Sequence, residues 1–140
     1  MGLFDKLNII RDIDEINTGA SAEEIQAFAL RVKHNCRIDL PEDYLEFLSL
    51  CDGFDFNGYC IYGTTDDIDS HLNMIEANFL FHKNDSLKRY WFYGTGSLSW
   101  YVLDTETNSY LDMDASEDVI ASFKTFGELV EHILIESVGE

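Results

Sequence analysis

Cysteine and histidine are the side chains of this sequence that could bind a transition metal or supply a nucleophile. His34 and Cys36 are close together, whereas the other candidates are scattered along the chain: Cys51, Cys60, His71 and His82. None of them shows the short, paired spacing that is typical of a structural zinc site. Cys51 falls on the apolar side of a predicted helix and Cys60 within a predicted strand, so we interpret both as small core residues. The sequence therefore predicts no metal site.

The acidic and glycine-containing motifs do not indicate catalysis either. Asp112 to Glu117 begins with alternate acidic residues, as an EF-hand calcium loop does. However, Glu117 stands where that loop needs glycine, and Phe123 where it needs a chelating glutamate. Gly94-Thr95-Gly96-Ser97 follows a predicted strand but lacks the third glycine and the lysine of a phosphate-binding loop. With no serine-hydrolase or zinc-protease motif in the sequence, we expect no catalytic residue and no cofactor.

The charge of the chain is strongly negative and narrows the possible partners. Its 27 acidic and 9 basic residues give a net charge of -18. Nucleic acid and anionic membranes are disfavoured as direct ligands, because binding to phosphate needs clustered lysine and arginine. A basic protein partner is compatible with this charge, and so is a purely solubilising role for the acidic surface.

The acidic residues gather in one part of the sequence. No lysine or arginine occurs from Ile38 to His82, a stretch that contains many carboxylates. We expect the best partner contacts to be acidic residues just after a helix and in a polar connection, because such loops are exposed. The candidates are Asp52, Asp55, Asp66, Asp67 and Asp69. Glu42 and Asp43 are weaker candidates, since acidic side chains in the first turn of a helix have a structural explanation.

The sequence also indicates the cellular compartment. The three cysteines are an odd number without a Cys-x-x-Cys pair, which fits reduced thiols better than a disulfide framework. The N-terminus lacks the apolar run of a signal peptide, and no apolar stretch reaches the ~18 residues of a membrane-spanning helix. We therefore expect a soluble cytoplasmic protein.

Helical periodicity predicts four helices that would position these residues. Apolar residues recur from Leu3 to Ile16 and from Ala22 to His34, the second stretch after a capping box formed by Ser21 and Glu24. A third helix begins at Pro41, and Gly53 is positioned to end it. A last helix follows the capping box of Thr125 and Glu128. Its apolar stripe consists of Phe126, Leu129, Val130, Ile133 and Leu134.

The middle of the chain reads as strands. Aromatic and β-branched residues predict strands at Tyr59–Tyr62, Tyr90–Tyr93, Trp100–Leu103 and Tyr110–Met113, the last two as a hairpin. Asp66 to Phe81 fits no single period well, and a helix is favoured there. This segregation of helices and strands predicts one α+β domain over residues 1–140. It would contain a central antiparallel sheet of about four to six strands packed by N-terminal and C-terminal helices.

Four sequence blocks in this order resemble the SUKH superfamily, in the branch related to the yeast cell-wall synthesis regulator. They are Leu40-Pro41-Glu42-Asp43-Tyr44 with Phe47-Leu48 and Asp52-Gly53; Ile61-Tyr62-Gly63; Tyr93-Gly94-Thr95-Gly96 leading to Tyr101-Val102-Leu103-Asp104; and Ser122-Phe123-Lys124-Thr125-Phe126 with Leu129. Together the blocks cover about residues 39–134. No block is diagnostic alone; their order and spacing carry the resemblance.

The resemblance implies a non-catalytic α+β domain. Many bacterial relatives are immunity proteins that neutralise a cognate polymorphic toxin, often a nuclease. A basic toxin would suit the acidic surface, because a nuclease must attract a polyanion. Two alternatives remain open: a regulatory or scaffold module that binds proteins, as in the eukaryotic branch, and a small-molecule domain with an aromatic pocket near Trp91, Trp100 and Tyr101. Large aromatic residues in strands are more often part of the core.

Overall fold

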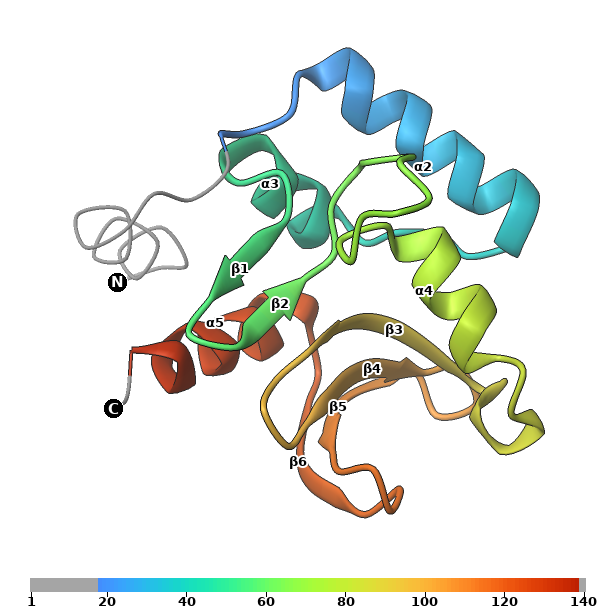
Figure 1. Cartoon of the computed structure of the whole chain (residues 1–140), viewed down its shortest axis with the longest axis vertical. Helices are drawn as coiled ribbons and strands as arrows, with labels where there is room; N and C mark the ends of the chain where they lie inside the picture. The colour runs from blue at the N-terminus through green and yellow to red at the C-terminus, as the bar shows by residue number, and fades with distance from the viewer. Residues whose placement is uncertain (1–17, 139–140) are drawn as a thin grey trace.

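The computed structural model describes residues 18–138, which form one α+β domain with an open antiparallel sheet (Figure 1). The described helices are α2 (Ala22–Cys36), α3 (Glu42–Leu50), α4 (Met74–Phe81) and α5 (Phe126–Ser137), with a 3₁₀ turn at Asp85–Leu87. The strands are β1 (Phe54–Phe56), β2 (Tyr59–Ile61), β3 (Tyr90–Thr95), β4 (Trp100–Asp104), β5 (Ser109–Met113) and β6 (Val119–Phe123). They form one six-stranded sheet in the order β1-β2-β3-β4-β5-β6. The predicted fold class is confirmed, whereas the helix expected from Leu3 to Ile16 lies outside the described residues.

Local capping sets the ends of α2 and α5. Ser21 and Glu24 form the predicted capping box at the start of α2, and Thr125 and Glu128 form the one at the start of α5. α2 runs to Cys36, beyond the predicted end at His34, and then Arg37 adopts a left-handed conformation with φ of 60°.

The start and the end of α3 both differ from the prediction. Pro41 is the extended residue before the helix and not its first helical residue, although its carbonyl oxygen accepts hydrogen bonds from Tyr44 and Leu45. The helix ends at Cys51 in an extended conformation, so the prediction that Gly53 ends it was wrong. Gly53 does have a positive φ of 87°, in the turn that leads into β1.

Two short strands at the edges of the sheet were not predicted. β1 pairs with β2 through a two-residue turn, Asn57-Gly58, in which both residues have positive φ, the geometry that a tight hairpin requires. β6 is an edge strand in which Val119 and Ile120 are exposed, so its burial does not alternate clearly. Neither strand carries a period-2 apolar pattern long enough to be recognised.

Strand β3 continues through Gly94 and Thr95, so the predicted stop at these residues was wrong. Gly94 pairs with Ile61 of β2, and a Cβ atom at Gly94 would lie 2.0 Å from the carbonyl oxygen of Cys60. The glycine is therefore needed for close approach of the two strands and not for a turn. A register shift between Phe92 and Gly94 accompanies this approach.

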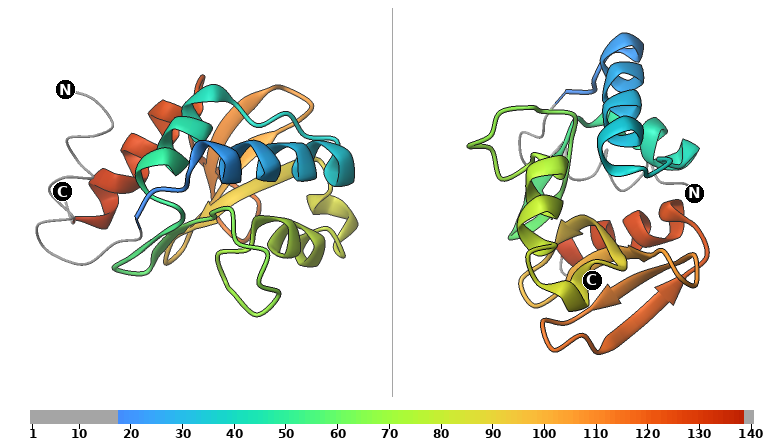
Figure 2. Two further views of the ribbon diagram at one scale, coloured as in Figure 1. Left: turned by 90° about the horizontal axis from the view of Figure 1, so that it is seen from above. Right: turned by 90° about the vertical axis from the view of Figure 1, so that its right-hand side faces the viewer.

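The core lies between the helices and the sheet. The apolar stripe predicted in the last helix is buried, as expected, and Tyr44, Phe47 and Leu48 of α3 are fully buried as well. Tyr93 of β3 contacts Tyr44 of α3 and Phe126 of α5, with ring centroids 5.1 Å apart in both pairs. Its neighbour Phe92 instead stacks on Phe81 of α4 at 3.9 Å. α2 packs on α3, at the outside of the molecule (Figure 2).

Helix α4 covers the part of β3 that β2 leaves unpaired. β2 pairs with β3 only at Thr95 and Gly94, so the backbone at Tyr90 and Phe92 has no strand partner on that edge. The buried side chain of Asn78 donates to the Phe92 carbonyl oxygen at 3.0 Å and accepts from the Phe92 N–H at 2.7 Å. His82 Nε2 lies 2.7 Å from the Tyr90 carbonyl oxygen. Side chains of a helix thus take the place of a neighbouring strand.

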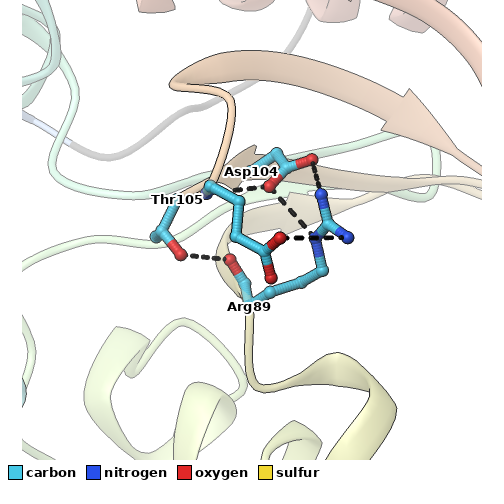
Figure 3. A network of polar contacts seen from close by, with 4 residues as sticks. Arg89, Asp104 and Thr105 are labelled. Atoms are coloured by element: carbon cyan, nitrogen blue, oxygen red, sulfur yellow. Dashed lines mark hydrogen bonds and ion pairs between the residues drawn. The ribbon is translucent and has the colours of Figure 1, made fainter.

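An ion pair fixes the far end of the β3–β4 hairpin (Figure 3). Arg89 donates to both carboxylate oxygens of Asp104, from Nε at 3.1 Å and from Nη2 at 2.7 Å. The Thr105 hydroxyl donates to the Arg89 carbonyl oxygen at 2.6 Å. Burial by itself would raise the pKa of Asp104, but the hydrogen bonds and the charge of Arg89 outweigh it and hold that pKa below its ordinary value.

Candidate partner-binding surface

The loop between β2 and α4, residues 62–73, carries three of the five predicted contact residues and is here called the acidic loop. It projects from the body of the domain between α2 and α4 (Figures 1 and 2). Its two ends meet at a bridge between Gly63 and Asn73, where the Gly63 N–H donates to the Leu72 carbonyl oxygen at 3.0 Å. Compact loops with closed ends of this kind are often functional.

Asp52 holds the base of the acidic loop. Its carboxylate accepts from the Thr64 N–H at 2.7 Å and from the Thr64 hydroxyl at 2.8 Å. Arg31 of α2 donates to the Thr64 carbonyl oxygen at 3.1 Å. Asp52 is only partly exposed, so its clear role in the fold is to position the loop that follows.

The tip of the acidic loop presents three exposed carboxylates, Asp66, Asp67 and Asp69. Ile68 lies among them with 69% of its surface exposed, the second-highest exposure among the large apolar residues described. The Asp67 side chain accepts from the Asp69 N–H at 3.0 Å, and its carbonyl oxygen accepts from Asn73 Nδ2 at 3.0 Å. Hydrogen bonds within the loop thus support the conformation of its tip. Ile68 is not among the predicted contact residues, although an isoleucine flanked by aspartates in a polar segment is a recognisable signal.

Asp55 lies on β1, outside the acidic loop, but a side chain from the loop reaches it. His71 Nε2 is 2.7 Å from Asp55 Oδ2, and Asp55 faces Cys60 across the hairpin. Burial, reinforced by the charge of Asp55, raises the pKa of the Cys60 thiol to about 11. Cys60 is half-buried beside polar groups, so its assignment to the core was wrong, whereas Cys51 is fully buried as predicted.

Within residues 18–138, two groups of side chains have donor atoms close enough to hold a metal ion. In each group the ligand atoms lie within 4.8 Å of one another; the groups are Asp55, Cys60 and His71, and Asp112, His132 and Glu136. In the second group His132 Nε2 lies 2.8 Å from Asp112 and 3.5 Å from Glu136. Sequence spacing could show only the His132–Glu136 pair, four residues apart in α5; the other ligands of both groups come from separate elements. The expectation of no metal stays a prediction.

The segment that begins like a calcium loop is a polar turn. The Asp114 carboxylate accepts from the backbone N–H groups of Ser116 and Asp118, at 2.8 and 3.1 Å, and so binds its own turn. The three cysteines are free thiols, in agreement with the predicted reduced state. Within residues 18–138, no helix has the length and apolar character to cross a membrane.

The aromatic residues proposed for a small-molecule pocket are not brought together. Trp100 packs against Phe92 with ring centroids 5.7 Å apart, and Tyr101 lies near the His132 ring at 6.5 Å. Of the three predicted residues only Trp91 lines the cavity beside α4. Trp91 and Tyr101 are buried in the core.

These features define a small α+β domain with an exposed acidic loop whose two ends are joined by a bridge. A model of the SMI1/KNR4 family (SUKH-1) matches residues 19–132, and the chain therefore belongs to this family. The match begins at residue 19 and therefore includes α2. The sequence blocks that indicated the family covered only about residues 39–134. Comparison with curated proteins gives no match.

Proposed function

We propose that this protein is a non-catalytic immunity protein that binds and neutralises a cognate toxin, a nuclease with a basic surface. Membership of the SUKH family supports this function. The observation that carries the proposal is the acidic loop, which presents Asp66, Asp67 and Asp69 around the exposed Ile68 on a tip held by internal hydrogen bonds.

The loop has the physical properties of a recognition element. Its carboxylates would attract lysine and arginine from the site at which a nuclease binds phosphate, which speeds encounter. Ile68 would enter an apolar pocket of the toxin and be fully desolvated, as interface anchors are. The hydrogen bonds within the tip favour its conformation before binding, so binding should lose less conformational entropy than it would with a loop that lacks them. Asp55 would contribute at the margin, since it already pairs with His71.

Co-expression with the toxin candidate encoded beside this gene tests the proposal. The wild-type protein is expected to protect the cell, and simultaneous reversal of Asp66, Asp67 and Asp69 to lysine is expected to abolish protection while the protein stays folded. A matched control reverses three exposed acidic residues on other elements, Glu46, Glu117 and Asp118, and is expected to protect.

The kinetics of binding give a second readout. Raising the salt concentration is expected to slow association of the wild-type protein much more than dissociation, because exposed charges are screened beyond about 10 Å at 0.1 M salt. The Ile68→Ala variant is expected to dissociate faster with little change in association. Equal protection by the loop variant and the control would remove the acidic loop from the interface. A wild-type protein that neither binds nor protects would refute the immunity function for that pair.

A further inference from the structure

A cavity of about 640 Å³ lies between the C-terminal end of α2, helix α4 and the start of β3. Its volume is in the range of pockets that bind small molecules. The residues that matter for its chemistry are Arg37, Ile75, Phe79, His82, Lys88 and Trp91. The cavity takes no part in the toxin contact proposed above.

The charge of this cavity is opposite to that of the protein. None of its lining residues is acidic, although the chain has 27 acidic residues, while Arg37 and Lys88 both line it. Arg37 forms no ion pair within the described part of the chain, and Lys88 pairs only with the highly exposed Asp85, at 2.9 Å. Burial raises the pKa of the Cys36 thiol, so this lining residue is neutral at physiological pH and adds no negative charge.

The walls of the cavity are partly aromatic, and Trp91, one of the residues that line it, is almost completely buried. Phe79 is 61% exposed, an unusual position for a phenylalanine on a helix. Trp91 is 3% exposed, and its indole Nε1–H is buried with no acceptor among the described residues. A buried N–H without an acceptor is unfavourable, and most such groups in proteins are satisfied. His82 cannot accept from it through Nε2, because that nitrogen donates to the Tyr90 carbonyl oxygen.

We propose that this cavity binds a small anionic molecule with a planar apolar body, of the class of aromatic carboxylates. The anionic group would lie between Arg37 and Lys88, and the ring would pack on Phe79 and Ile75. A lining charge opposite to that of the protein and an apolar wall in one cavity together favour this chemistry.

Titration of the whole protein with 2-naphthoate tests the proposal, and the uncharged 2-naphthamide serves as the matched ligand. The readout is the indole N–H resonance of Trp91, which the Trp91→Phe spectrum distinguishes from that of Trp100. Naphthoate is expected to shift this resonance in a saturable way. Naphthamide is expected to bind at least about tenfold more weakly, because it lacks the charge that would make one favourable contact with the cations of the cavity.

Two charge reversals locate the binding site. Arg37→Glu is expected to weaken naphthoate binding about tenfold or more, because it turns an attraction into a repulsion. Lys124→Glu, at an exposed position outside the cavity, is expected to leave the affinity unchanged. Three results would each overturn the proposal. The first is equal affinity for naphthoate and naphthamide, and the second is an equal loss of naphthoate affinity in the two variants. The third is a shift of the Trp100 resonance while that of Trp91 does not move. Failure here leaves the immunity function intact, because the toxin assay involves neither ligand.

Discussion

Replacement of Asn78 by alanine is expected to lower the free energy of unfolding mainly because hydrogen bonds are lost, and only to a small extent because packing contacts are lost. Asn78 is 1% exposed, and its side chain makes hydrogen bonds to the Met74 carbonyl oxygen and to both backbone polar groups of Phe92. The Asn78→Ala variant leaves the N–H and the C=O of Phe92 buried with no strand beside them. Each such group costs about 1–3 kcal/mol, so the expected loss is about 2–6 kcal/mol.

Urea unfolding at 25 °C, followed by circular dichroism, measures this loss. Domains of this kind have total stabilities of about 5–15 kcal/mol, so the variant folds in the absence of urea wherever the wild-type stability exceeds the expected loss, and a variant that is unfolded without urea has lost the whole of that stability. Asn35→Ala, at an exposed asparagine in α2, is the matched control. It should be neutral or slightly stabilising, because alanine is the better helix former.

A third variant separates the hydrogen-bond donor of the Asn78 side chain from its acceptor. Asn78→Asp keeps an acceptor for the Phe92 N–H but replaces the donor by a carboxylate facing two carbonyl oxygens. It should be at least as destabilising as the alanine variant at neutral pH. A loss below about 1 kcal/mol for Asn78→Ala would show that water satisfies Phe92, and would refute the view that α4 replaces a strand.

Three further predictions follow from packing and ionisation. Phe47→Ala should cost about 3–5 kcal/mol in urea unfolding because Phe47 is fully buried, whereas Phe79→Ala, at an exposed ring, should cost well under about 1 kcal/mol. Because the pKa of Asp104 is lowered in the folded state, its ion pair with Arg89 stabilises the fold above the unfolded pKa, and this contribution is lost as pH falls through the folded pKa. Arg89→Gln should therefore lower stability at pH 7 more than at pH 2. Burial raises the pKa of Tyr110 to about 12, so folding should weaken as pH rises from about 10 to 12. The difference in absorbance at 295 nm between the wild type and Tyr110→Phe isolates this ring among the seven tyrosines, and should show that it ionises at higher pH than in the unfolded chain. Ionisation of Tyr110 at its ordinary pKa in the folded protein would contradict this burial.

The acidic loop illustrates both the reach and the limit of sequence analysis. The base-free stretch from Ile38 to His82 correctly identified a segment rich in exposed carboxylates. It could not distinguish Asp52, which binds Thr64 at the base of the loop, from Asp66, which is exposed at its tip. That distinction depends on which backbone groups the fold brings beside each carboxylate.

The sequence by itself determined the features that depend on residues close to one another in the chain, within one helical turn or one strand. The capping boxes that begin with Ser21 and Thr125 join residues three positions apart, so their hydrogen bonds form wherever the helix lies. The apolar stripe of α5 and the β4–β5 hairpin were predicted for the same reason, because each is encoded by its own periodicity. The α+β class followed from the order of these local elements.

Only the tertiary structure decided how these elements meet. Asp43 of α3 accepts from the Gly127 N–H of α5 at 2.7 Å, across 84 positions of sequence, and His71 reaches Asp55 across 16. The cavity beside Trp91 likewise exists because α2, α4 and β3 converge there. Distances between remote residues depend on how all the helices pack on the sheet, and no local pattern records that packing. The carboxylates were thus visible in the sequence, whereas their partners were not.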